Sequence, residues 1–265
     1  MLKKIELIKL KLRKMNELNK LVDIIKKLRA PNGCDWDREQ THESLIPYLL
    51  EETYEVIEAI NNQDYKALKE ELGDLLLHVI FQAELANEKK EFMLNDSIIN
   101  VNNKLIKRHP HIFDNNNDDS YKKGNWELGK QKEKNRNSIL DGVPKALPSL
   151  TKSRRIQEKA AGVGFDWDDI EQVIKKVDEE LGELKQAIKL DKGKEEELGD
   201  LLFSLVNLSR HLNIDPENAL NKAIDKFSKR FHKIEIKLKQ ENINISDLTL
   251  EELDLIWNEI KIKEK

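Results

Sequence analysis

The chain has 265 residues and a formal net charge of −4, and this length suits one large domain or two of moderate size. Charged residues make up 36% of the chain and aromatic residues 6%, which is typical of a helical protein with a charged surface and argues against a β-sheet protein. The net negative charge gives no general attraction to nucleic acid, and no apolar run reaches the length of a membrane-spanning helix, so we expect neither nucleic-acid nor membrane binding.

Helical periodicity continues along nearly the whole chain, without the alternation of a β-strand. In the first half we expect helices at 2–29, 42–61, 64–88, 94–108 and 121–137. In the second half we expect helices at 149–160, 168–190, 193–212, 215–240 and 249–264. Residues 114–120, which are rich in Asn and Asp, predict a loop, and the turn signals between Asp141 and Pro148 predict a hinge.

The two halves repeat the same motifs in the same order, at offsets of 122–131 residues. An Asp-Trp-Asp motif precedes a Glu-Glu-x-x-Glu motif, and Glu-Leu-Gly-Asp-Leu-Leu follows. A Lys-x-x-x-Arg pair and a Trp-x-x-x-Lys pair complete each copy. The prediction is an all-α protein of two tandem helical bundles related by duplication: an N-terminal domain at 1–140, a hinge at 141–150 and a C-terminal domain at 151–265.

Each copy contains two carboxylate pairs at i, i+3 spacing, which places both members of a pair on one helix face. The pairs are Glu52 with Glu55, Glu71 with Asp74, Glu180 with Glu183, and Glu197 with Asp200. Four carboxylates from two helices make an all-oxygen site that suits Mg²⁺, with Mn²⁺ as a substitute. A di-iron bundle is the rival interpretation, but that class typically needs Glu-x-x-His, which neither copy has.

The helices around Glu71 and Glu197 are apolar on nearly all sides, which predicts that they are buried. Buried carboxylates are costly without a partner. Glu71, Asp74 and His78 lie on one narrow stripe of the first helix, and Glu197, Asp200, Ser204 and Asn207 lie on one stripe of the second. Since neither stripe contains a Lys or Arg, a divalent cation is the simplest partner.

The basic pairs Lys104 with Arg108 and Lys226 with Arg230 lie at i, i+4, so each could hold phosphoryl groups. A solvated helix face is the alternative for either pair. Lys176, one turn before Glu180, is another candidate phosphate contact. Trp126 and Trp257 could stack on a base or belong to the core. Cys34 is the only cysteine, which excludes an internal disulfide and fits a reducing cytoplasm.

Several segments together resemble the MazG family of nucleoside triphosphate pyrophosphohydrolases. They are Gly33–Thr41, Leu50–Glu55, Glu71–Leu76, Arg108–Phe113 and Val163–Trp167, and the resemblance extends from about Glu17 to the C-terminus. It implies an all-α homodimer that hydrolyses NTPs or dNTPs to the monophosphate and pyrophosphate with Mg²⁺.

The resemblance also implies that the C-terminal domain carries the main activity. The Mg²⁺ ligands would then be Glu180, Glu183, Glu197 and Asp200. The nucleotide would be contacted by Lys176, Gly193 to Glu196, Lys226 to Arg230, and Trp257. Lys104, Arg108 and Trp126 are the matching residues of the N-terminal copy.

The resulting hypothesis is attack of an oriented water on the α-phosphorus, with pyrophosphate as the leaving group and Lys226 and Arg230 stabilising the triphosphate. One alternative is a narrower enzyme, such as a dUTP/dCTP or phosphoribosyl-ATP pyrophosphatase, although such relatives usually have one copy of the motif. The other alternative is a metal-binding regulatory helical module without turnover. The sequence does not select the base or the sugar.

Overall fold

The computed structural model describes residues 17–113, 127–129, 131 and 133–264. These residues form two compact units on either side of the segment 114–126. Every regular element in the described ranges is helical, which confirms the all-α prediction. The relative placement of the two units is not determined, so each is described by itself.

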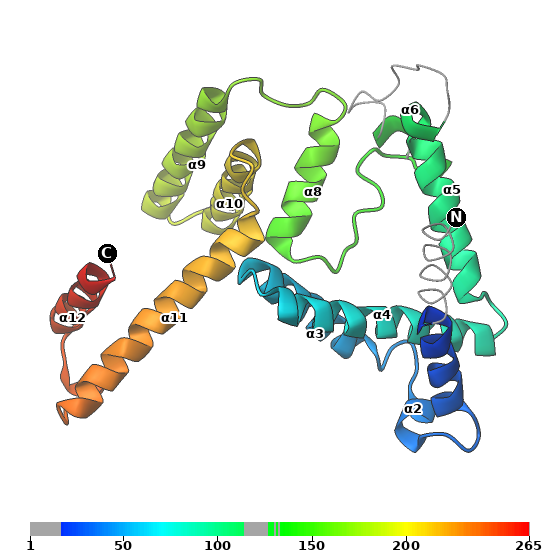
Figure 1. Cartoon of the computed structure of the whole chain (residues 1–265). Coiled ribbons are helices and arrows are strands. Elements are labelled where there is room, and N and C mark those ends of the chain that lie inside the picture. The colour runs from blue at the N-terminus through cyan, green and yellow to red at the C-terminus, as the bar shows by residue number, and fades with distance from the viewer. Residues whose placement is uncertain (1–16, 114–126, 130, 132, 265) are drawn as a thin grey trace, which may run out of the picture. The chain divides into compact units, whose positions relative to one another are not determined.

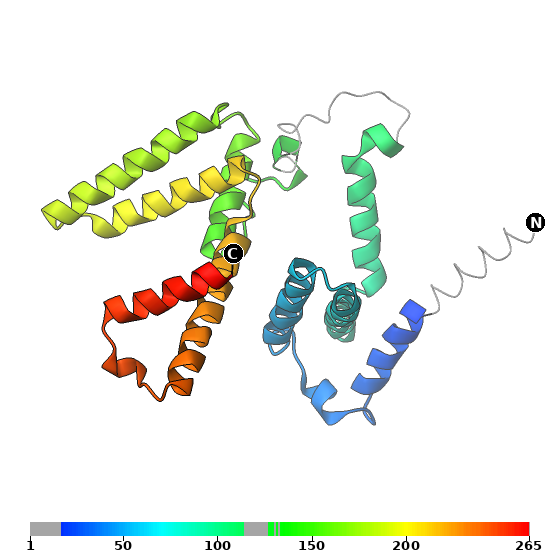
Figure 2. The ribbon, with the colours of Figure 1, turned by 60° about the vertical axis from the view of Figure 1, so that its left-hand side comes forward.

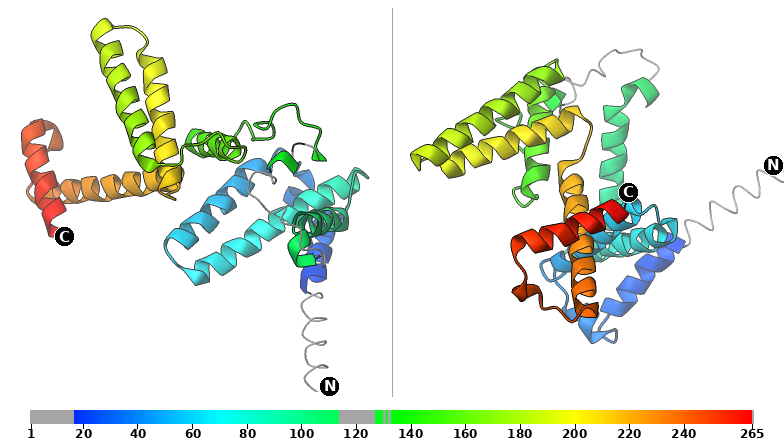
Figure 3. Two further views of the ribbon diagram at one scale, coloured as in Figure 1. Left: turned by 90° about the horizontal axis from the view of Figure 1, so that it is seen from above. Right: turned by 90° about the vertical axis from the view of Figure 1, so that its left-hand side faces the viewer.

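The N-terminal unit begins with a helix over 17–29, followed by the short helix α2 (Asp35–Glu39). Two long helices, α3 (Ile46–Asn61) and α4 (Tyr65–Glu88), pack side by side as a hairpin, as the left view of Figure 3 shows. Helix α5 (Leu94–Arg108) and the short helix α6 (Pro110–Phe113) complete the unit.

The described part of the C-terminal unit begins at residue 127, where residues 127–129, 131 and 133 are helical. Residues 134–148 contain only turns and bends and lead to α8 (Ser149–Ala161). Helices α9 (Ile170–Leu190) and α10 (Lys194–His211) form a second hairpin (Figure 1). Helix α11 (Pro216–Gln240) leads away from this hairpin to a 3₁₀ turn (Ile245–Asp247) and α12 (Leu250–Lys263), which folds back onto α11 (Figure 2).

Nine of the ten expected helices are present, and their ends lie within a few residues of the predicted limits. For the first helix this comparison covers only the part from residue 17 onward. Residues 1–16 lie outside the described residues, as do the predicted loop at 114–120 and eight of the seventeen residues of the tenth expected helix, at 121–137. Among the described residues of that range, 127–129, 131 and 133 are helical. Side-chain caps explain the accurate starts: Asp64, Asp169 and Asp215 each accept a backbone N–H of the first turn. Thr249 and Glu252 form a capping box at α12.

Glu127 and Ile139 contact α8 of the C-terminal unit. Lys159 of α8 is buried, and its Nζ donates to Glu127 Oε2 at 3.0 Å and to the Ile139 carbonyl at 2.8 Å. The predicted domain limits and the hinge at 141–150 stay predictions.

The prediction that the central helices are buried on nearly all sides is wrong for α4 and α10. In α4, Leu72, Leu76 and Val79 form a row that is 41–49% exposed. The equivalent row in α10 contains Leu198, Leu202 and Leu205, at 43–48% exposed. The error arose because the neighbouring helices together cover only part of each long helix, and the residue pattern of a single helix does not reveal which part.

None of the helices in the described ranges is long and apolar enough to cross a membrane.

Candidate functional site

The two helical hairpins bring the paired carboxylates together. In the N-terminal unit, carboxylate oxygens of Glu52 and Glu55 from α3 and of Glu71 from α4 all lie within 4.8 Å of one another. In the C-terminal unit, Glu180 from α9 meets Glu197 and Asp200 from α10 within the same distance. The structure thus assembles three of the four predicted carboxylates in each copy, whereas Asp74 and Glu183 lie outside these tight groups.

The short connection between α9 and α10 sets this arrangement. Asp191 and Gly193 both adopt positive φ, of 54° and 76°, so the chain reverses within a few residues. Glycine adopts this conformation without steric cost. Gly193 to Glu196, predicted to contact nucleotide, lie at this turn and in the first turn of α10, with Glu196 exposed.

The carboxylates outside the tight groups still interact with them electrostatically. Partial burial and the neighbouring charges of Asp74 and Glu55 raise the pKa of Glu52. In the C-terminal unit, desolvation and the charges of Glu180 and Glu197 raise the pKa of Glu183. Such mutual repulsion favours either protonation or a bound cation.

Glu180 also has a basic partner, Lys176, which lies one turn earlier on the same helix, α9. Lys176 Nζ lies 2.7 Å from Glu180 Oε1 and 2.8 Å from Glu179 Oε1. These hydrogen bonds raise the pKa of Lys176 and keep it charged. The argument that a divalent cation is the simplest partner was made for the carboxylates on the helices of Glu71 and Glu197, and it does not extend to Glu180, which has this ammonium partner.

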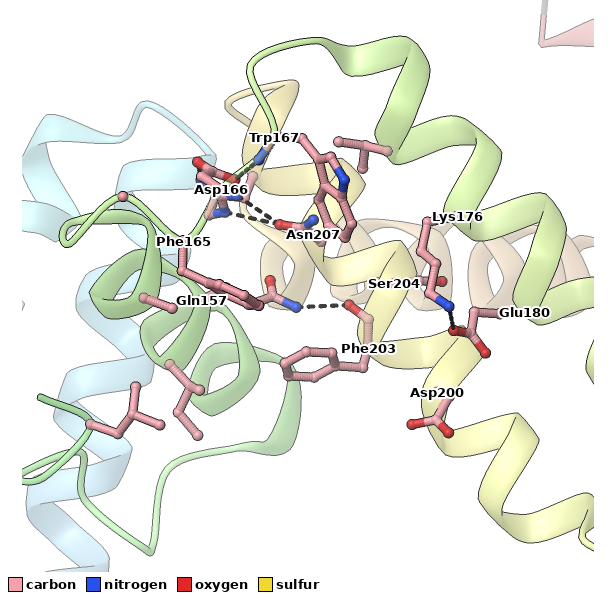
Figure 4. A pocket seen from close by; sticks show the side chains of 16 residues that line it. Gln157, Phe165, Asp166, Trp167, Lys176, Glu180, Asp200, Phe203, Ser204 and Asn207 are labelled. Atoms are coloured by element: carbon pink, nitrogen blue, oxygen red, sulfur yellow. Dashed lines mark hydrogen bonds and ion pairs between the residues drawn. The ribbon is translucent and has the colours of Figure 1, made fainter. Parts of the chain in front are cut away.

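A pocket of about 600 Å³ opens beside the C-terminal carboxylates. Figure 4 shows Glu180, Asp200 and Lys176 along one side of it, with the aromatic side chains of Phe165, Trp167 and Phe203 elsewhere in the wall. Ser204 and Asn207, which share the predicted stripe of Asp200, line the pocket as well. Gln157 of α8 also lines it and belongs to none of the predicted motifs.

Lys226 and Arg230, the predicted basic pair of the C-terminal half, do not line this pocket. Arg230 Nε donates to Glu264 at 2.7 Å, and its guanidinium lies 5.6 Å from the centre of the Trp257 ring. Trp257 also packs on Phe227, with 5.1 Å between ring centres. No hydrogen bond or ion pair joins Lys226, Arg230 or Trp257 to the carboxylate cluster within the described part of the chain.

The equivalent N-terminal residues are less fully described. Lys104 and Arg108 are half-buried on α5, whereas Trp126 lies outside the described residues. Trp36, the aromatic residue of the first Asp-Trp-Asp motif, packs edge-on against Tyr48 with 5.9 Å between ring centres. The structure does not bring Lys104 or Arg108 into hydrogen-bond contact with the Glu52 cluster among the described residues.

Comparison with known proteins adds independent information. The sequence profile of the MazG nucleotide pyrophosphohydrolase domain matches this chain twice, at residues 40–113 and 169–234. A nucleoside triphosphate pyrophosphohydrolase/pyrophosphatase MazG of Thermotoga maritima is 50% identical over 243 residues, covering 91% of this chain and 94% of that protein. The nucleoside triphosphate pyrophosphohydrolase of Escherichia coli K12 is 41% identical over 261 residues, covering 94% and 99%.

Proposed function

The chain belongs to the MazG family of nucleotide pyrophosphohydrolases, and on that premise we propose that the carboxylate cluster of its C-terminal unit is the main catalytic centre. The reaction is the hydrolysis of a nucleoside triphosphate to the monophosphate and pyrophosphate. The observation that supports this site is the meeting of Glu180, Glu197 and Asp200 within 4.8 Å at the wall of a pocket.

The donor set of this cluster fits a hard divalent cation. All three groups are carboxylates, and Glu183 on the next turn of α9 extends the set to four, which favours Mg²⁺ with Mn²⁺ as substitute. When bound, such an ion neutralises triphosphate charge and lowers the pKa of a coordinated water. Glu52, Glu55, Glu71 and Asp74 form the equivalent set in the N-terminal unit.

The remaining steps belong to the side chains of this chain. The carboxylates orient a water for attack on the α-phosphorus, and pyrophosphate leaves. Lys176 lines the pocket beside Glu180, where its ammonium group can donate to a phosphate oxygen of the substrate. Exposed Cys34 has no part in this reaction.

Lys226, Arg230 and Trp257 require a second copy of the chain in this proposal. As far as the described residues show, none of the three lines the pocket of its own chain, and Trp257 of α12 packs on Phe227 of α11 instead. In a homodimer, the α11–α12 arm of one chain can reach the cluster of its partner. The exposed apolar rows on α4 and α10 are the surfaces that such a dimer would cover.

Sedimentation equilibrium with and without Mg²⁺ tests the homodimer. The expected mass is twice the 31.0 kDa of one chain, and Leu202→Glu, which puts a charge into the α10 row, should reduce it to one chain. A wild-type mass of one chain would reject the dimer.

A matched pair of variants tests which copy is catalytic. Asp200→Asn and Asp74→Asn make the same change at equivalent positions of the repeat. We expect Asp200→Asn to abolish release of pyrophosphate from each NTP and dNTP with Mg²⁺, and Asp74→Asn to retain most of the wild-type rate. Equal losses in both variants would reject the assignment to the C-terminal unit. Release of orthophosphate and diphosphate would reject attack at the α-phosphorus.

A further inference from the structure

The pocket of the C-terminal unit extends well beyond its carboxylates. From Glu180 and Asp200 it continues along α10 to Phe203 and Asn207, and across to α8 and the loop that follows it (Figure 4). Its volume of about 600 Å³ lies within the usual range for small-molecule sites, about 300–1,000 Å³. The wall is mostly apolar and includes the half-exposed ring of Trp167, so a flat ligand could stack there.

Gln157 contributes a hydrogen-bond acceptor without a partner. Its Nε2 donates to the Phe203 carbonyl at 2.9 Å, which determines the orientation of the amide because a carbonyl can only accept. Gln157 Oε1, on the other side of the amide, is buried and has no hydrogen-bond partner within the described ranges. Leaving a buried acceptor unpaired is costly, which indicates that a donor is missing here.

Asn207 contributes a donor in the same way. Its Oδ1 accepts from Arg210 Nε at 3.1 Å and from Arg210 Nη2 at 2.8 Å. Because arginine can only donate, this contact directs the Asn207 Nδ2 group away from Arg210. Among the described residues, Nδ2 has no hydrogen-bond acceptor.

Arg210 is itself held in place and acts as a positioning residue. Its Nη1 donates to Asp166 Oδ2 at 2.9 Å, and His211 Nε2 lies 3.2 Å from Asp166 Oδ1. Asp166 precedes Trp167 in the loop after α8, so one network orients Asn207 and fixes the loop that bears the aromatic ring. A loop anchored in this way can present the Trp167 ring in one position.

We propose that this wall binds the base of the nucleoside triphosphate, with Gln157 and Asn207 as the residues that determine base preference. The inference rests on the proposed function, because it places the triphosphate at Glu180 and Asp200 of the same cavity. Every nucleobase offers a flat face for stacking and an edge with donors and acceptors. A peptide ligand would lack the extended flat ring that the Trp167 wall accommodates. The proposal differs from the sequence prediction of base stacking by Trp257, which packs on Phe227 instead.

The decisive variant is Asn207→Asp. It keeps an oxygen for Arg210 but replaces the free donor by an acceptor, so it alters recognition with little effect on packing. We expect the ratios of kcat/KM among ATP, GTP, CTP and UTP to change about tenfold or more, because a site built to hydrogen-bond one edge rejects a mismatched edge strongly. Asn95→Asp, an exposed residue in the first turn of α5, makes the same chemical change outside the pocket and should leave every ratio unchanged.

Gln157→Met supplies a second variant of similar volume that removes the orphan acceptor, and its base ratios should change as well. Ratios within twofold of the wild type in both variants, with folding verified by circular dichroism, would overturn the proposal.

A binding measurement separates this proposal from the assignment of the catalytic centre. The four nucleoside monophosphates are titrated into the protein in EDTA, where neither a metal nor turnover is required, and tryptophan fluorescence is followed. A change of base order between wild type and Asn207→Asp supports the base pocket even if the Glu180 cluster proves inactive. An identical order in the two proteins, or no binding of any monophosphate, overturns it.

Discussion

Glu179 and Glu180 are neighbours on α9 that form nearly identical ion pairs, yet only Glu180 belongs to the carboxylate cluster. Lys176 Nζ lies 2.8 Å from Glu179 and 2.7 Å from Glu180. The Glu179 side chain is 56% exposed, whereas that of Glu180 is 8% exposed and meets Glu197 and Asp200. Substitution of each by glutamine therefore separates loss of the ion pair from loss of the cluster.

We expect Glu180→Gln to lower metal affinity and kcat/KM by about 100-fold or more, because loss of residues that merely support a metal ligand already costs roughly 10–100-fold. Glu179→Gln should change either quantity by no more than about threefold, since exposed ion pairs contribute about 0–1 kcal/mol.

The assay is pyrophosphate release from ATP across a Mg²⁺ titration, with the Mg²⁺-induced rise in Tm as a readout that does not depend on turnover. Equal losses in the two variants would refute the reasoning, as would a Glu180→Gln enzyme within threefold of the wild type.

Three further outcomes follow from the described contacts. Burial and neighbouring carboxylates raise the pKa of folded Glu52, so its ionisation opposes folding. In EDTA at pH 7–8, Glu52→Gln should therefore raise Tm by about 1 °C, and the difference should disappear below pH 4. A lower Tm of the variant at neutral pH would contradict this. Mg²⁺ should raise the wild-type Tm more at pH 8 than at pH 5, because carboxylates bind a metal in their deprotonated form; equal shifts would argue against a carboxylate site. Lys159→Met should lower the free energy of unfolding, measured in urea, by about 3 kcal/mol, since it removes the ammonium partner of the buried Glu127 carboxylate. The double variant with Glu127→Leu should recover most of that loss. No recovery would refute the ion-pair explanation.

The helices could be predicted from the sequence because their signals are local. Apolar periodicity marks each long helix, and caps such as Asp64 and Thr249 mark where helices begin. The i, i+3 carboxylate spacing likewise predicted all three side chains that converge in each unit, together with one in each, Asp74 or Glu183, that lies outside the tight group. Helices as short as α2 and α6 were missed, because four or five residues do not establish a period.

The remaining parts of the site depend on how separate elements pack. Whether Glu183 or Glu180 joins the tight cluster depends on the rotation of α9 against α10, which spacing along one helix does not determine. Gln157 belongs to no motif, and its unpaired oxygen becomes evident only when α8 lies against Phe203. The exposure of Leu72 and Leu198 depends on which neighbour covers each helix, and this information is not contained in the helix itself.

The two copies of the repeat differ most where the pocket requires polar groups. In the register of the shared Gly-Asp motif, Asn207 of α10 corresponds to Phe81 of α4, and Ser204 corresponds to His78. Phe81 is buried in a hydrophobic cluster with Ile25, Leu45, Ile80 and Leu85, so an apolar core occupies the position that holds the Asn207 amide in the other copy. Burial also lowers the pKa of His78 and favours its neutral form. Both units thus contain an acidic cluster, whereas the polar groups that we propose contact the base belong to the C-terminal unit. Four carboxylates are enough for a metal site, but selection among substrates also requires polar groups in the pocket wall beside the carboxylates. The absence of an equivalent amide at Phe81 is a physical reason for the proposal that the main activity belongs to the second copy.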